Sequence, residues 1–182
     1  MLRIQEKILI HRARRGDQNA FAKLYNEYVE QIQRFVLFKV SDQDRAEELV
    51  STIFTKTLDY LLNGNEIKNF RALLYQIARH AIVDFYRNGK QQIISLDEVL
   101  EKDFSEKLDL DEKLDIKLDL EKIKEALKKI SDPYREVLIL RFVEELSFKE
   151  IAKIVEQSEV NVRQIASRGL KLLRKKLQEC QF

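Results

Sequence analysis

The amino-acid sequence predicts an all-α protein in which two small helical domains are joined by an acidic linker. The 182-residue chain has four glycines and one proline, so it holds few breakers for a strand-and-turn fold. Residues that favour helices, such as Leu, Ile, Lys, Glu, Ala and Arg, dominate its composition. Residues 1–90 carry a net charge of +4, residues 91–119 carry −6 and residues 120–182 carry +4. Two basic blocks around an acidic segment indicate two domains and a linker, and basic blocks favour polyanions as partners.

The composition also bounds the compartment. One cysteine, Cys180, cannot form an internal disulfide and has no neighbouring metal ligands in the sequence. The amino terminus, MLRIQEKILIHRARRGD, lacks a signal-like apolar run, and no stretch approaches the roughly 18–20 apolar residues of a membrane span. We therefore expect a cytoplasmic protein without membrane insertion.

The first block is predicted to hold several helices. Asp17, after Gly16, can cap a helix that runs on through residue 36. Its expected inward face comprises Ala20, Phe21, Leu24, Tyr25 and Tyr28. Ser41-Asp42 offers the next cap, and the acidic residues that follow suit the opening turns of a helix. The apolar stripe of this helix comprises Leu49, Val50, Ile53, Phe54, Thr57, Leu58 and Leu61.

A third long helix is predicted from Phe70 to about Arg87. The segment Asn63-Gly64-Asn65 ends the helix before it, since Asn and Gly tolerate the left-handed conformation. The apolar set of the third helix comprises Leu73, Leu74, Ile77, Ala78, Ala81, Ile82 and Phe85.

The acidic middle is ambiguous. LDLDEKLDIKLDL, residues 108–120, alternates at nearly period two, which suggests a strand. Leu110, Leu114 and Leu118 are also spaced at i, i+4, which suits a helix. We expect residues 91–107 to be extended or mobile, with a helix established by about residue 112.

The last block predicts a pair of short helices with a polar break. Ser131-Asp132-Pro133 caps a short helix that covers Tyr134 to Val143, and Ser147 caps the first helix of the pair. The second helix has apolar residues Val162, Ile165 and Ala166, which can share a buried face. Polar side chains between them then point outward, as in a helix that pairs with base edges and phosphates. An amphipathic hairpin with a solvated face fits this stretch equally well.

Four segments of the chain resemble parts of one protein family, and they occur in the same order as in that family. FRALLYQIARHAIVDFYR, residues 70–87, is similar to the promoter-melting segment of a bacterial RNA polymerase sigma factor. Residues 131–177 resemble the sigma domain that reads the upstream promoter element. GDQNAFAKLYNEYVEQIQRF and DQDRAEELVSTIFTKTLDYL, residues 16–35 and 42–61, match the intervening pieces. A short chain with these two domains resembles the extracytoplasmic-function (ECF) group.

The resemblance implies three functional parts. Residues 1–90 would bind core polymerase and melt the downstream (minus-ten) element, and residues 119–182 would form a helix-turn-helix domain that reads the upstream (minus-thirty-five) element. Residues 91–118 would be a linker whose negative charge imitates nucleic acid in the RNA path of the polymerase, or alternatively a solvated spacer. Core RNA polymerase and promoter DNA are the implied partners, an anti-sigma factor is a further candidate, and no cofactor or metal is expected.

The resemblance also implies the contact residues. For docking on a coiled coil of the largest polymerase subunit they are Glu47, Glu48, Leu49 and Phe54, with Ser51 and Thr52 where the family usually has amide or acidic residues. For the downstream element they are Asn65, Asn69, Arg71, Arg79, His80 and Arg87. For the upstream element they are Ser158, Asn161, Arg163, Gln164, Ser167, Arg168 and Lys171.

Three departures from the family pattern stand out. His80 occupies a position where the family often has Asn, and Leu73 replaces its usual Trp, so no role for that ring is carried over. The turn between the last two helices reads Val155-Glu156-Gln157, where a Gly would commonly adopt the left-handed conformation. A non-Gly residue in that conformation costs roughly 1–2 kcal/mol, unless the turn takes another shape.

We therefore expect a transcription initiation subunit and not an enzyme. The chain has two His, one Cys, no Gly-rich phosphate loop and no paired metal-ligand spacing. The alternatives are a dimeric helix-turn-helix regulator that acts without polymerase docking, and a helical interaction protein with two solvated faces.

Overall fold

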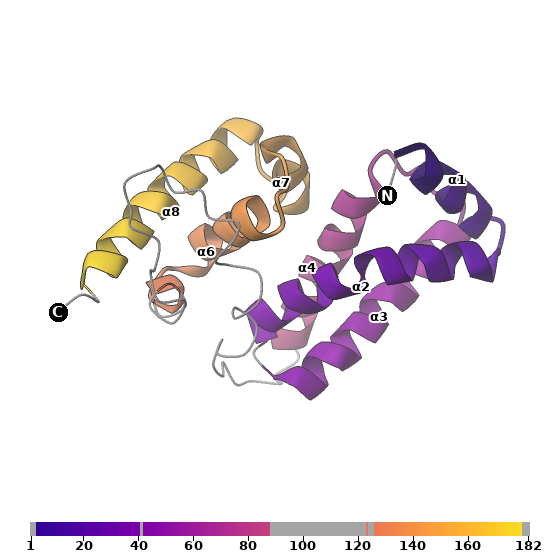
Figure 1. Ribbon diagram of the computed structural model, residues 1–182, viewed down its shortest axis with the longest axis horizontal. Helices are drawn as coiled ribbons and strands as arrows, with labels where there is room; N and C mark the ends of the chain where they lie inside the picture. The colour runs from indigo at the N-terminus through magenta and orange to yellow at the C-terminus, as the bar shows by residue number, and fades with distance from the viewer. Residues whose placement is uncertain (1–2, 41, 88–122, 124–125, 180–182) are drawn as a thin grey trace. The chain divides into compact units, whose positions relative to one another are not determined.

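The computed structural model describes residues 3–40, 42–87, 123 and 126–179, and every regular element within these ranges is a helix. The chain divides into two compact units, Met1–Ile94 and Ser95–Phe182 (Figure 1). The all-α, two-domain prediction is thus confirmed. The predictions for residues 91–107 and for a helix by residue 112 lie outside the described residues.

Unit 1 is built from α1 (Arg3–Ala13), α2 (Gln18–Val40), α3 (Gln43–Leu62) and α4 (Phe70–Arg87). The long helix α2 packs against each of the other three (Figure 1). Its buried side chains are Ala20, Leu24, Tyr28, Ile32, Phe35, Val36, Phe38 and Val40. Tyr28 also ties α1 to α2, because its hydroxyl donates a hydrogen bond to the Glu6 carboxylate, and burial raises its pKa.

Local caps fix where these helices begin. The Asp17 carboxylate accepts a hydrogen bond from the Ala20 N–H at 3.0 Å, and the Asp42 carboxylate accepts one from the Arg45 N–H at 2.9 Å. Both caps confirm the sequence predictions. At the other end of α3, Gly64 adopts φ +76°, the left-handed conformation that ends the helix.

Unit 2 contains α6 (Asp132–Leu138), the π-helical turn η1 (Ile139–Val143), α7 (Phe148–Ile154) and α8 (Glu159–Glu179). Pro133 lies in the first turn of α6, as predicted, whereas Ser131 makes no side-chain cap hydrogen bond. The predicted helix does run to Val143, but its second half is π-helical and not α-helical. There the Glu144 N–H donates to the Ile139 carbonyl at 3.0 Å, a five-residue spacing. This wider turn contributes Ile139, Leu140 and Val143 to the unit's core, and all three are buried.

The α7–α8 pair forms the predicted helix-turn-helix. Ser147 and Glu150 form a capping box at the start of α7, and the Ser158 hydroxyl accepts from the Asn161 N–H at 3.1 Å at the start of α8. Between the helices Glu156 adopts φ 56°, so the left-handed conformation is present without a glycine. Val162 and Ala166 are buried as predicted, while Ile165 is half-buried.

Candidate functional site

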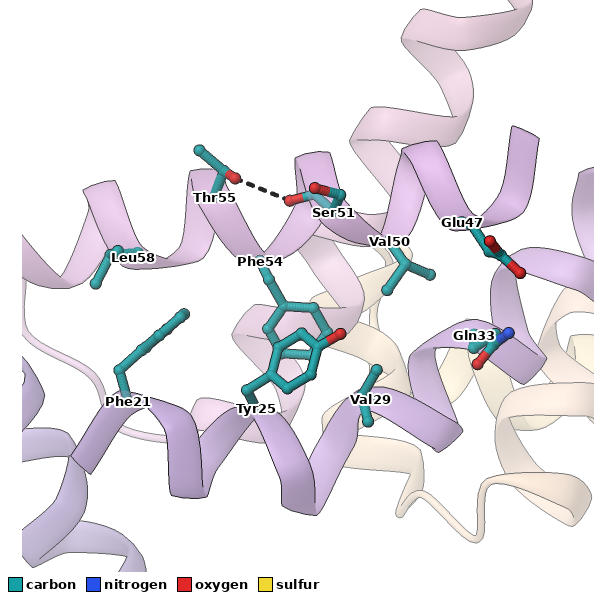
Figure 2. A pocket seen from close by; sticks show the side chains of 10 residues that line it. All are labelled: Phe21, Tyr25, Val29, Gln33, Glu47, Val50, Ser51, Phe54, Thr55 and Leu58. Atoms are coloured by element: carbon teal, nitrogen blue, oxygen red, sulfur yellow. Dashed lines mark hydrogen bonds between the residues drawn. The ribbon is translucent and has the colours of Figure 1, made fainter. Parts of the chain in front are cut away.

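A groove of about 540 Å³, lined by apolar and polar side chains, runs between α2 and α3 (Figure 2). Its lining residues are Phe21, Tyr25, Val29, Gln33, Glu47, Val50, Ser51, Phe54, Thr55 and Leu58. The rings of Tyr25 and Phe54 meet across it with their centroids 4.6 Å apart, while Gln33 and Glu47 give one end a polar rim (Figure 2). The groove can therefore receive an apolar surface and pair its edge with a polar or cationic group.

A second hollow of about 310 Å³ continues the groove along the same two helices. It shares Phe21, Tyr25 and Leu58 with the first and extends to Leu62. Tyr25 is 38% exposed and Leu62 is 49% exposed, which is high for large apolar side chains. These two side chains are therefore accessible to a partner along α2 and α3.

The residues expected to dock on polymerase are divided by this geometry. Glu47 is exposed at the rim, and Phe54 lines the groove although it is 3% exposed. Glu48 is exposed but does not line the groove, and Leu49 is buried, with 8% of its surface exposed.

Sequence reasoning missed the contribution of α2 to this surface. Tyr25 and Phe21 were expected to face inward, but Tyr25 is exposed and Phe21 is half-buried, since the core needs one stripe of α2 and takes it from Ala20, Leu24 and Tyr28. The available signal was the width of the apolar set, which exceeds what one buried stripe requires.

The loop before α4 and its first turn use their polar side chains for structure. The Asn69 side-chain oxygen accepts from the Ala72 N–H at 2.9 Å and caps α4. The Asn65 amide donates to the Tyr60 carbonyl at 3.0 Å, and Arg14 donates to the Gly64 carbonyl. These hydrogen bonds fix the conformation of the loop before α4, which is the loop predicted to approach the downstream element.

Along α4 the predicted cations do not share one face. His80 and Arg87 are seven residues apart, about two turns, and both are exposed. Arg71 lies nine residues before His80, nearly opposite on the helix, and its guanidinium lies 6.0 Å from the centre of the Tyr75 ring. Arg79 is half-buried, and Arg87 pairs with Asp84 at 3.1 Å. His80 and Arg87 are therefore the members best placed for an external ligand.

The exposed face of α8 carries most of the predicted upstream contacts. Gln164, Ser167, Arg168 and Lys171 are exposed. The helix has six Lys or Arg residues against two Glu, and its opposite face is buried through Val162, Ala166, Gly169, Leu173 and Leu177. Ser158 and Asn161 serve the helix start, with the Asn161 amide donating to Gln157 at 2.8 Å.

The guanidinium of Arg163, near the start of α8, is held by two contacts. It pairs with Glu159 at 2.6 Å and lies 4.5 Å from the centre of the Phe148 ring. Its side chain nevertheless remains 58% exposed. Neither Phe148 nor Glu159 was singled out from the sequence.

Two chemistries have no counterpart in the described part of the chain. Within it, no group of three or more His, Cys, Asp or Glu side chains is arranged to hold a metal ion. None of its helices is both long and apolar enough to cross a membrane.

This geometry, a helical docking unit and a helix-turn-helix unit with a basic polar face, is that of a DNA-binding transcription protein. Comparison with known families agrees: residues 24–92 match the model of Sigma-70 region 2, and residues 120–173 match the model of Sigma-70 region 4. The chain belongs to the ECF group of RNA polymerase sigma factors. Its function is transcription initiation with RNA polymerase, and the dimeric regulator is not favoured.

Individual relatives span most of the chain. It is 27% identical to the ECF RNA polymerase sigma factor SigX of Bacillus subtilis (strain 168) over 88% of this chain and 85% of SigX. It is 30% identical to the RNA polymerase sigma factor SigV of the same organism over 78% of this chain and 81% of SigV.

Solved structures share the fold. CnrH, solved in complex with the cytosolic domain of CnrY, aligns with a TM-score of 0.71 at 22% identity over 96% of this chain and 98% of CnrH. The sigma factor RpoE from Bartonella quintana, solved in complex with the anti-sigma factor NepR, aligns with a TM-score of 0.64 at 22% identity over 87% of this chain and 96% of RpoE.

Proposed function

We propose that residues 1–90 dock on core polymerase and engage the downstream promoter element, that residues 119–182 read the upstream element, and that residues 91–118 link them. The observation that carries this proposal is the exposed face of α8. Its polar and cationic side chains lie opposite a buried apolar face, as a helix that enters the major groove requires. The acidic linker lies outside the described residues.

The polymerase docks in the groove between α2 and α3. A helix of the largest subunit can bury apolar side chains against Tyr25 and Phe54, while Glu47 at the rim pairs with a cation. Aromatic side chains in such a groove are the residue types that carry most interface energy. Glu48 lies on the neighbouring exposed face of α3, and Leu49 supports the helix from inside.

The downstream element meets the exposed face of α4. His80 can donate to or accept from a base edge, and Arg87 can contact a backbone phosphate once it leaves Asp84. The loop before this helix is shaped by Asn65 and Asn69 through their hydrogen bonds. Arg71 lies against the Tyr75 ring, and Arg79 is half-buried beside the exposed face.

The upstream element is read by α8. Arg163 and Gln164 lie near its amino-terminal end, where an Arg fork suits guanine and a Gln amide suits adenine. Arg168 and Lys171 lie farther along the helix and contact the backbone. Ser167 supplies a hydroxyl to either kind of partner.

The protein acts in the cytoplasm, where polymerase and DNA are found, and performs no catalysis itself. An anti-sigma factor is a further partner, supported by the complex in which RpoE was solved. The free protein binds duplex promoter weakly, near the non-specific range of about 10⁻⁴–10⁻⁶ M, because its two reading surfaces need the polymerase to fix their spacing.

Run-off transcription with core polymerase on genomic fragments tests this proposal. Defined start sites that appear only when the protein is added, at promoters sharing two spaced elements, are the expected result. Tight, sequence-specific binding of the free protein as a dimer, without added transcription, would overturn it.

A further inference from the structure

We propose that Phe148 and Glu159 are positioning residues for promoter reading: together they hold the Arg163 guanidinium in one orientation at the start of α8. This inference rests on the proposed upstream-element reading by Arg163 and adds to it two side chains that do not themselves touch DNA. It assigns a specificity-determining role to an aromatic ring in α7, the helix that precedes the reading helix.

The ring of Phe148 is itself fixed. Phe148 is the first residue of α7, directly after the N-cap Ser147, whose capping box with Glu150 sets the local backbone. The Arg141 guanidinium lies 4.9 Å from the centre of the same ring and also donates to the Leu146 carbonyl at 3.0 Å. The half-buried ring is therefore anchored by the turn that carries it and by a neighbouring cation.

Arg163 meets this ring from α8. Its guanidinium carbon lies 4.5 Å from the ring centre, within the range of a cation–π interaction. On the same side chain, one terminal nitrogen pairs with the Glu159 carboxylate one helical turn earlier, at 2.6 Å. Two contacts of different chemistry thus restrain a side chain that is more than half exposed, at 58%.

Restraint matters because a free Arg side chain loses much rotamer entropy when it binds. A guanidinium already held by a ring face and one carboxylate keeps its other N–H donors in a fixed fork. A fixed fork fits the two acceptors of guanine better than it fits other bases, so restraint raises discrimination more than affinity. Glu159 also lowers the affinity for DNA, because its carboxylate repels DNA phosphates.

These contacts predict two distinct effects. Phe148→Leu keeps an apolar side chain but removes the ring face, and should flatten base preference at the position read by Arg163 by roughly 2- to 5-fold, the range of an exposed cation–π contact. Phe148→Tyr keeps the ring face and should retain the preference. Glu159→Gln should flatten the same preference while raising output on all sequences.

The test is transcription by full-length variants with core polymerase from a library randomised in the upstream element, with transcripts sequenced. Arg163→Ala and the double variant Phe148→Leu/Arg163→Ala complete a cycle. The expected result is that Phe148→Leu changes the same position as Arg163→Ala and changes nothing further in the Arg163→Ala background. Thermal unfolding of each variant monitors folding, and Glu159→Gln tests the idea without touching the ring.

The following results would overturn the inference, and all but the last differ from failure of the proposed function. If Phe148→Leu lowers output equally on every sequence, or acts as strongly in the Arg163→Ala background, the ring is structural. If the Glu159→Gln protein keeps the base preference unchanged, the Glu159 carboxylate does not position Arg163. If Arg163→Ala itself leaves preference unchanged, Arg163 does not read a base, and both its proposed role and this inference fail.

Discussion

The ring of Tyr25 in α2 lies against the ring of Phe54 in α3, with centroids 4.6 Å apart and planes inclined by 58°. Phe54 is buried, with 3% of its surface exposed, whereas Tyr25 keeps 38% of its surface exposed within the groove. The pair therefore presents one aromatic ring that remains accessible to a partner.

Tyr25→Ala is therefore expected to weaken docking on core polymerase by about tenfold, as loss of a central aromatic anchor does. The measurement is titration of labelled full-length protein with core enzyme. Ile4→Ala provides the control, since Ile4 is 75% exposed on α1 and does not line the groove. Equal affinity of the Tyr25→Ala and Ile4→Ala proteins would place the polymerase contact elsewhere.

Gln164→Ala and Arg168→Ala are expected to fail differently. Loss of a base contact at Gln164 should cost roughly 1–3 kcal/mol at one position of the upstream element and relax preference there. Arg168→Ala should weaken binding to all sequences alike. It should also make the slope of log affinity against log salt concentration shallower by about one unit. Library transcription at several salt concentrations separates the two. A uniform loss from both variants would mean that α8 does not read bases.

Acid sensitivity should depend in part on Asp17. The Ala20 N–H and then Arg12 hold the pKa of its carboxyl below the ordinary value of 3.8. A carboxyl whose pKa is lowered by folding stabilises the fold above its unfolded pKa, and this contribution is lost as pH falls through the folded pKa. Asp17→Asn keeps a capping oxygen but not the charge.

The Asp17→Asn protein should therefore melt at a lower temperature than wild type at neutral pH, with the difference shrinking in acid. Thermal unfolding, followed by circular dichroism from neutral to acidic pH, measures this difference in melting temperature. Asp59→Asn is the control for loss of one charge, because Asp59 is an exposed residue on α3. A difference that persists unchanged in acid would contradict the assignment.

Glu156→Gly should stabilise unit 2 by up to about 1 kcal/mol. Glu156 adopts φ 56°, a conformation that costs a non-Gly residue roughly 1–2 kcal/mol, and the flexibility of Gly in the unfolded chain offsets part of the gain. Lys153→Gly, in the last turn of α7, should instead destabilise, by at most about 1 kcal/mol. Chemical denaturation of both variants provides the comparison, and destabilisation by Glu156→Gly would show that its side chain matters more than its backbone.

Gly169→Val should destabilise by about 1–3 kcal/mol, since overpacking a tight contact displaces its neighbours. A Cβ at Gly169 would lie 3.3 Å from the Leu138 side chain, which is 3% exposed and cannot move away freely. Lys171→Val on the exposed face of α8 changes helix propensity alone and should cost about 0.5 kcal/mol. Similar melting temperatures for the two variants would mean that α6 shifts to accommodate the larger side chain at little cost.

Local chemistry made much of this fold predictable. Asp42, Ser147 and Ser158 begin their helices through hydrogen bonds within three residues, so the sequence holds all the information. The apolar stripe of α3 likewise followed from spacing, and all its predicted members are buried except the half-buried Leu58.

Contacts between distant residues were not predictable in the same way. Phe148 reaches Arg163 across fifteen positions, and no period or cap links them. The groove arises because α2 offers more apolar side chains than one stripe can bury, and which ones stay outside depends on how α3 packs. Burial likewise decided that Leu49 belongs to the core.

The π-helical turn η1 also has a consequence for how chains of this kind change length. A π turn accommodates one residue more than an α-helical turn over the same path. Deleting one of its less buried residues, Arg141 or Phe142, would let the turn close as α-helix while Leu138 and Val143 keep their places. A deletion within α8 would instead rotate every later side chain by about 100°. Alignments of related chains should therefore tolerate a one-residue gap at Ile139–Val143 and reject one in α8.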